Sequence, residues 1–364
     1  MEEYALTLDE LLIELRDREG SDLHVRAGEP PVFRIHGVLY RTDHPVFTPE
    51  HTKSLMYSIM NDAQKAKYER DWEMDMAYEL ADVARFRVNC FRQQRALGAV
   101  MRLIPIRIES IDDLGLPPVL KDIALLPRGL VLVTGPTGSG KSTTLAAMVD
   151  EINRAKRGHV MTVEDPIEFV HTDKRCAINQ REVGIDCRSF QDALRHVLRQ
   201  NPDVILVGEM RDLETIGLTI TAAETGHLVF ATLHTTDAMQ TVDRAVDVFP
   251  PQQQNQIRMQ LAVTLQAVIC QGLLPRADAT GRIPAFEVML ATPAIRALIR
   301  EGKTHQIYNM IQSGHEHGMI VLDQYLVELV RQGLVNYEEA LVKSSYPAEF
   351  ARRCGASIEE AALL

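Results

Sequence analysis

Four runs of apolar residues recur through the middle of the chain, and longer polar or helical segments separate them. Each run is rich in Val, Leu and Ile. Apolar strands separated by segments of crossover length are typical of a parallel sheet that is buried on both faces. The pattern therefore predicts an α/β domain whose core strands are Leu130–Thr134, Val160–Val163, Val204–Val207 and Leu228–Leu233.

The chain before the first run has the mixed pattern of a small α+β domain, which we place at residues 1–105. We expect one helix over roughly residues 7–18 and a second from Pro49 to about Arg70. A hairpin is predicted over Val32–Tyr40, and strands over Arg85–Asn89 and Ala99–Ile104. Residues 106–127, which are rich in proline around Gly115-Leu116-Pro117-Pro118, form the predicted linker to a larger domain at 128–364.

The chain beyond about residue 250 is predicted to be helical. Thr292 precedes Pro293, which is typical of a helix cap followed by proline at the first helical position. That helix covers residues 294–300, and a C-terminal helical region is expected from about residue 285. Pro250-Pro251 opens an earlier helix with apolar positions at Ile257, Leu261, Leu265 and Val268.

The first apolar run leads directly into a phosphate-binding motif of the G-x-x-x-x-G-K-[ST] type. Its glycines allow backbone N–H groups to surround a polyphosphate, and the following helix directs its positive end toward the phosphates. Lys141 would reach the β- and γ-phosphates, and Ser142 would ligate Mg²⁺. The motif predicts that ATP or another nucleoside triphosphate binds at Gly135, Pro136, Thr137, Gly138, Ser139, Gly140, Lys141, Ser142 and Thr143.

Carboxylates follow two of the other runs, where ligands gather in open α/β sheets. We assign Glu164 as the base that activates water and Glu209 as the ligand of a Mg²⁺-bound water, although these roles can be exchanged. Gly208 stands where a Walker-B motif usually has Asp, so Glu164 and Asp165 would supply the missing carboxylate, with Asp165 as a further metal ligand. The alternative for Glu164 is a cap at the start of a turn.

Two histidines flank the fourth run. His234 lies at its carboxyl end, where it could sense the γ-phosphate or orient Glu209. His227 precedes the run and is a weaker candidate for nucleotide binding. A histidine beside a strand is more often a packing or capping residue, and this alternative stays open for both.

Composition adds limits on partners and location. The chain has 39 basic and 50 acidic residues and a formal net charge of -11, which disfavours nucleic acid as the main partner. The acidic N-terminus does not resemble a signal peptide, and no apolar run approaches the roughly 20 residues that span a bilayer. The five cysteines form no C-x-x-C pair, so we expect reduced thiols and a cytoplasmic location.

Taken together, these motifs resemble those of the secretion ATPases. The likeness covers the Walker A motif, the aspartate box, the atypical Walker B motif and the histidine box. Within that superfamily the chain is similar to the PilT family, the type IV pilus retraction ATPases of twitching motility. The residues that carry this resemblance are Gly135–Thr143, Thr162–Glu168, Gly208–Thr215, Thr225–Thr235, Gly20–His24, Arg85–Asn89 and Asp247–Pro250.

The resemblance implies a PAS-like N-terminal domain, a RecA-like P-loop ATPase domain and a homohexameric ring. In such a ring, ATP hydrolysis with Mg²⁺ drives pilin removal from the fibre through an inner-membrane platform protein. A paralogous retraction ATPase is a further candidate partner. The resemblance also implies that Arg87 and Arg102 reach the nucleotide, a point that the residues alone leave open. Ala294–Glu301 resembles the AIRNLIRE element of the family, with Ala297 in place of Asn.

Related pilus extension and type II secretion ATPases carry a tetracysteine zinc insertion and typically an extra N-terminal domain. In this chain Cys270 is the one cysteine near the corresponding region. Retraction is therefore the favoured function. An accessory retraction paralogue, an assembly ATPase and a regulatory nucleotide-binding ring stay as alternatives.

Overall fold

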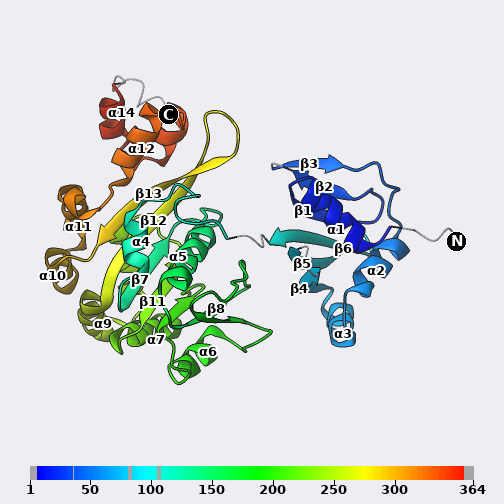
Figure 1. Ribbon diagram of the computed structural model, residues 1–364, viewed down its shortest axis with the longest axis horizontal. Helices are drawn as coiled ribbons and strands as arrows, with labels where there is room; N and C mark the ends of the chain where they lie inside the picture. The colour runs from blue at the N-terminus through cyan, green and yellow to red at the C-terminus, as the bar shows by residue number, and fades with distance from the viewer. Residues whose placement is uncertain (1–5, 36, 81–83, 105–107, 356–364) are drawn as a thin grey trace. The chain divides into compact units, whose positions relative to one another are not determined.

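The computed structural model describes residues 6–35, 37–80, 84–104 and 108–355. The chain divides into two compact units, Met1–Arg107 and Ile108–Leu364 (Figure 1). Each has its own hydrophobic core, so each is described by itself.

The smaller unit contains a six-stranded antiparallel sheet in the order β3-β2-β1-β6-β5-β4. The predicted hairpin and the two later predicted strands are confirmed, and the class is α+β as expected. The strands are β1 (Gly20–Val25), β2 (Val32–Ile35), β3 (Val38–Arg41), β4 (Glu73–Leu80), β5 (Ala84–Gln93) and β6 (Ala96–Ile104), and the helices are α1 (Leu8–Asp17), α2 (Pro49–Ser58) and α3 (Asp62–Asp71).

The single helix predicted from Pro49 to about Arg70 is wrong, because the structure has two helices, α2 and α3, in that range. The side chain of Asn61 accepts a hydrogen bond from the backbone N–H of Gln64 at 2.9 Å, and the Gln64 side chain accepts one from the Asn61 N–H. This reciprocal cap starts a new helix at Asp62. A pattern of apolar positions does not reveal such an interruption.

The predicted linker at 106–127 is also corrected. Residues 106 and 107 lie outside the described residues, whereas the chain from Ile108 onward belongs to the larger unit. Ile111, Leu116 and Leu120 are buried in its core, and the helix α4 (Val119–Ala124) follows Pro117-Pro118. The prolines that suggested a linker therefore lead into a packed helix.

The larger unit is built on a seven-stranded sheet in the order β13-β12-β7-β11-β10-β8-β9. All neighbouring strands are parallel except β13, which pairs antiparallel with β12. The four predicted core strands are confirmed as parallel strands of this sheet. Its strands are β7 (Gly129–Thr134), β8 (His159–Glu164), β9 (Ala177–Glu182), β10 (Val204–Val207), β11 (Leu228–Leu233), β12 (Leu265–Pro275) and β13 (Arg282–Leu290).

Helices bury both faces of the sheet, because alternate residues of each central strand enter different clusters. Leu130 and Leu132 of β7 pack in one cluster, and Val131 and Val133 pack in the other. The first cluster includes residues of α6 (Phe190–Val197), α7 (Leu213–Glu224), α8 (Ala238–Asp247) and α9 (Pro251–Thr264). The second includes residues of α4 and α5 (Lys141–Ala155).

The prediction of helix throughout the region after residue 250 is wrong in part. The helix α9 ends at Thr264, and Leu265 and Val268 lie in β12, which pairs with the central strand β7. Their spacing fits a helix, but pairing with β7 buries this apolar run as a strand. The C-terminal helices begin at Pro293 rather than at about 285, and they are α10 (Pro293–Glu301), α11 (Ile307–Ser313), α12 (Leu322–Arg331), α13 (Tyr337–Lys343) and α14 (Pro347–Cys354), with short 3₁₀ turns at Thr304–Gln306 and His315–His317.

The predicted cap of α10 is confirmed. The Thr292 side chain accepts a hydrogen bond from the backbone N–H of Ile295, and Pro293 occupies the first helical turn. Gly302 ends the helix with a φ of 69°, a left-handed conformation that glycine adopts without strain.

Candidate active site

Four parallel strands deliver the predicted catalytic residues to one edge of the larger sheet. The P-loop follows β7, Glu164 ends β8, Glu209 lies two residues beyond β10, and His234 directly follows β11. These strands are neighbours in the order β7-β11-β10-β8. Their carboxyl ends therefore meet at the same edge, as the sequence predicted.

Strand β12 fixes the shape of the P-loop from the side. A Cβ added at Gly135 would lie 2.1 Å from the carbonyl oxygen of Gln271, and one at Gly140 would lie 2.8 Å from its Nε2. Both glycines have positive φ angles, 142° and 89°. Only glycine fits this combination of backbone conformation and close approach.

The loop carries a set of donors suited to a polyphosphate. Lys141 Nζ donates to the carbonyl oxygens of Gly135 at 2.8 Å and Pro136 at 3.0 Å. Burial lowers the pKa of Lys141, and the negative charges of Glu209 and Glu168 oppose this change. Ser139 Oγ is buried and has no hydrogen-bond partner in the described structure.

The helix α5 begins at Lys141, and no side chain caps it at Gly140. Its first backbone N–H groups therefore belong to the loop, which is the arrangement that binds phosphate at a helix N-terminus. Ser142 and Thr143, both partly buried, lie in this first turn, whereas Pro136 and Thr137 form the exposed tip of the loop. The unpartnered Ser139 hydroxyl, the lysine and the uncapped helix together fit a triphosphate with Mg²⁺.

Glu209 is held by two side chains, those of Arg211 and His234. Its Oε1 accepts a hydrogen bond from Arg211 Nε at 2.6 Å and lies 2.5 Å from His234 Nε2. Burial alone would raise its pKa, but the contacts with Arg211 and His234 outweigh burial and lower the pKa. Glu209 is therefore a carboxylate at neutral pH, and His234 is placed to orient it. With Thr235 and Arg244, these residues line a cavity of about 500 Å³.

Glu164 lies in a more enclosed environment. Its Oε1 accepts hydrogen bonds from Thr162 Oγ1 at 2.6 Å and from Gln180 Nε2 at 3.2 Å. Burial raises the pKa of Glu164, and the two hydrogen bonds reduce that rise. A carboxylate whose pKa is raised is a stronger base than an ordinary glutamate, which suits a group that accepts a proton from water. Asp165, the next residue, is exposed.

A family model described as "Type II/IV secretion system protein" matches residues 4–342. The chain belongs to this family. The type IV pilus retraction ATPase PilT of Pseudomonas aeruginosa is 51% identical over 345 residues, covering 95% of this chain and 100% of that protein. The type IV pilus ATPase PilU of the same organism is 40% identical over 336 residues, covering 92% and 88%.

A crystal structure of the pilus retraction motor PilT with bound ADP matches this fold with a TM-score of 0.90 at 45% identity. The match covers 95% of this chain and 99% of that one. This member of the secretion-system family is therefore an ATPase that uses a nucleotide, with the α/β fold predicted from its apolar runs.

His227 is separated from the other candidates of this secretion ATPase. Its backbone carbonyl accepts a hydrogen bond from the N–H of Gly129 at the start of β7, and its ring Nδ1 lies 3.0 Å from the carbonyl oxygen of Ala222. The six residues of β11 lie between His227 and His234, a distance of about 20 Å along a strand. Within a single chain His227 thus lies at the other end of β11 from His234, and its contact with a nucleotide stays a prediction.

Arg87 and Arg102 lie in the smaller unit as direct partners across β5 and β6. Both are exposed, and Arg102 Nε donates to the buried carboxylate of Asp22 at 2.8 Å. They share one face of the sheet because paired residues point to the same side. Their contact with the nucleotide stays a prediction.

Three residues of the site were missed from the sequence: Gln180, Arg211 and Gln271. Gln180 and Gln271 reach the site because their strands, β9 and β12, pair with β8 and β7. No local sequence pattern indicates this pairing. Arg211 lies inside the Gly208–Thr215 motif, so its position beside Glu209 was the signal that could have identified it.

Among the described residues no group of three or more His, Cys, Asp or Glu side chains is arranged to hold a metal ion. The described helices also include none that is long and apolar enough to cross a membrane.

Proposed function

We propose that this ATPase is the motor of type IV pilus retraction. The observation that carries the proposal is the match to the PilT retraction ATPase, at 51% identity over the whole of that protein. It is supported by the P-loop, Glu164, Glu209 and His234, which together can bind and hydrolyse a triphosphate.

In this proposal the P-loop N–H groups and Lys141 hold the phosphates of ATP and stabilise the charge that develops on them. Ser142, and Glu209 through a water, would hold Mg²⁺, which neutralises phosphate charge when bound. Glu164 accepts the proton of the attacking water, and His234 keeps Glu209 in place. Asp165, which is exposed beside Glu164, would be a further ligand of Mg²⁺.

The working assembly would be a homohexamer in the cytoplasm, at the inner-membrane base of the pilus, bound to the platform protein. Arg87 and Arg102 would reach a nucleotide there and stabilise the transition state. Nucleic acid is not an expected partner, because the formal net charge is -11.

The phenotype of a deletion strain tests retraction against its alternatives. If the protein retracts pili, the strain keeps surface pili in excess and loses twitching, because fibres are built but not withdrawn. Cells without pili would overturn the proposal and identify an assembly ATPase. A chain whose ATPase activity equals that of its Lys141→Ala variant would instead be a regulatory nucleotide-binding ring. The partly exposed Lys121, which is paired with Asp112, supplies the control Lys121→Ala.

An accessory retraction role is the second candidate, because the chain is also 40% identical to PilU. The two roles differ in a strain that has no other retraction ATPase. A main motor retracts pili alone in that background, whereas an accessory motor does not.

A further inference from the structure

The connection between β8 and β9, residues 165–176, links the aspartate-box strand to the outermost strand of the parallel sheet. Gln180 of β9 lies opposite Thr162 of β8 in the strand register. Its side chain points toward Glu164 and toward this connection, because it makes hydrogen bonds with both.

The amide of Gln180 uses its donors and its acceptor at once. Nε2 donates to Glu164 Oε1 at 3.2 Å and to the carbonyl oxygen of Phe169 at 2.8 Å. Oε1 accepts from the backbone N–H of His171 at 2.8 Å. Rotating the amide by 180° would place its oxygen against a carboxylate and a carbonyl, so one orientation is strongly preferred.

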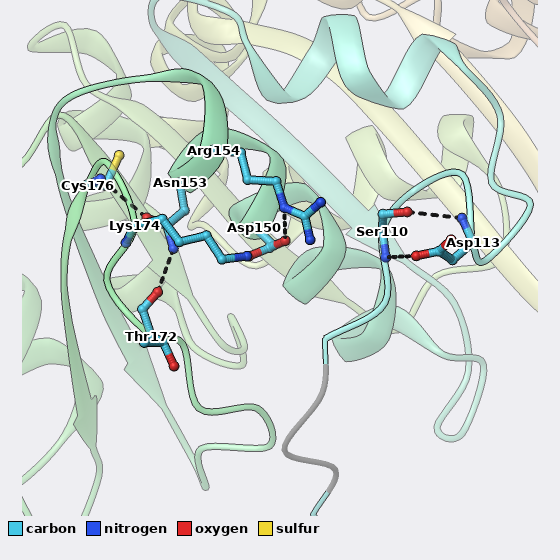
Figure 2. A network of polar contacts seen from close by, with 8 residues as sticks. All are labelled: Ser110, Asp113, Asp150, Asn153, Arg154, Thr172, Lys174 and Cys176. Atoms are coloured by element: carbon cyan, nitrogen blue, oxygen red, sulfur yellow. Dashed lines mark hydrogen bonds and ion pairs between the residues drawn. The ribbon is translucent and has the colours of Figure 1, made fainter.

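The rest of the connection is anchored to the P-loop helix. Asn153 of α5 donates to the Thr172 carbonyl at 2.8 Å and accepts from the Lys174 N–H at 3.0 Å and the Cys176 N–H at 3.2 Å (Figure 2). The buried Asp150, one turn earlier in α5, is paired with Arg154 at 2.7 Å and with Lys174. A continuous series of polar contacts therefore runs from α5 through the connection.

At the far end of this series, Glu164 has two donors on the same oxygen. Thr162, whose side chain is fully buried, donates from β8, the same strand that ends in Glu164. Gln180 donates from the neighbouring strand and is the one of the two that also holds the connection. Two donors on one oxygen restrict the rotation of the carboxylate and so the direction of its other oxygen.

We propose that Gln180 is a positioning residue for Glu164, and that its amide makes the orientation of this carboxylate depend on the connection 165–176. The inference rests on the proposed role of Glu164 as the base. Gln180 does not contact the P-loop in this arrangement, so its loss should slow hydrolysis and leave ATP binding intact.

The test compares Gln180→Met, which keeps the length of the side chain and removes the amide, with the unaltered protein. We expect kcat for ATP hydrolysis to fall roughly 10- to 100-fold, the range for a misplaced catalytic group. We expect the KM and the Kd for a fluorescent ATP analogue to change less than about two-fold. Asn179→Leu is the matched control, because Asn179 is the exposed neighbour on the same strand and contacts His159 instead. It should leave kcat unchanged.

A second variant guards against misfolding. Gln180→Leu also removes both amide donors and places no charge beside Glu164, so kcat should fall while the melting temperature stays within a few degrees of that of Asn179→Leu. A kcat within two-fold of normal for folded Gln180→Met or Gln180→Leu overturns the inference, as does a rise in Kd without a fall in kcat.

The Glu164→Gln background separates this inference from the proposed function. If Gln180 acts through Glu164, adding Gln180→Met to Glu164→Gln causes no further loss in single-turnover rate. An independent further loss shows that Gln180 acts elsewhere and overturns the inference alone. Normal turnover by Glu164→Gln itself removes Glu164 as the base and overturns the inference, whereas the proposed role in retraction is tested separately by the deletion strain.

Discussion

Glu287 of β13 is a buried carboxyl beside the loop that carries His234. It accepts a hydrogen bond from the backbone N–H of Ala238 at 2.8 Å, at the start of α8. Burial raises the pKa of Glu287 to about 7, and the nearby charges of Asp237 and Asp323 contribute to this rise. The hydrogen bond from Ala238 opposes it only in part.

This pKa predicts how stability depends on pH. Because the folded-state pKa lies above the unfolded one, the stabilisation is complete below about pH 4.5 and is lost as the pH rises through about 7. The shift corresponds to about 3 kcal/mol. Glu287→Gln keeps the acceptor for Ala238 and cannot ionise. Its melting temperature should therefore exceed that of the unaltered protein by more at pH 8 than at pH 5. A gap that is equal at both pH values, or one reproduced by the exposed control Glu316→Gln, would contradict this reading.

Individual residues were predictable where they followed a strand. The common location of Glu164, Glu209 and His234 was predictable because the carboxyl ends of parallel strands share an edge. The same argument does not extend to His227, since it precedes β11 and lies at the opposite edge of the sheet. Gln180 was not predictable, because its role arises from the pairing of β8 with β9.

At the scale of elements, the hairpin of β12 and β13 is the largest departure from the predicted fold. A helical spacing of apolar residues hid β12, although that strand supports the P-loop through Gln271. Thr144 Oγ1 donates to Gln271 Oε1 at 2.7 Å, so β12 also holds the first turn of α5. The missed strand is thus part of the candidate nucleotide site.

This packing predicts opposite results for two glycines. Gly135→Ala would bring a Cβ within 2.1 Å of the backbone oxygen of Gln271, which has little freedom to move in a paired strand. ATP binding should fall at least roughly 100-fold, a loss of about 2.7 kcal/mol. Gly272→Ala, next in β12, meets no atom within 4 Å and should bind ATP normally. Calorimetric titration with ATP measures both, and tight binding by Gly135→Ala would show that β12 does not constrain the loop.

At the scale of the whole molecule, the chain joins an ATPase unit to a smaller α+β unit with paired arginines on one sheet face. The apolar runs predicted the class of both units. The boundary was misplaced because prolines begin α4 as readily as they form linkers. Ring assembly leaves no comparable pattern in the sequence.

If the smaller unit contributes to catalysis, Arg102→Ala should lower kcat by about 10³-fold or more, the range for an arginine that stabilises phosphoryl transfer. Arg34→Ala is the control, because Arg34 contacts the same buried Asp22 at 3.4 Å. Steady-state ATPase assays measure kcat for both variants. Equal, small losses in kcat would show that Arg102 acts only through its structural ion pair with Asp22.

The most direct measurement of the central claim follows labelled pili on living cells whose only copy of this protein carries Lys141→Ala. In the proposed mechanism Lys141 holds the phosphates, so the variant should fold without supporting hydrolysis. We predict that pili extend at the normal rate and then stay extended, while Lys121→Ala cells retract theirs. Retraction at the normal rate in Lys141→Ala cells, or cells that build no pili, would contradict the identification of this ATPase as the retraction motor.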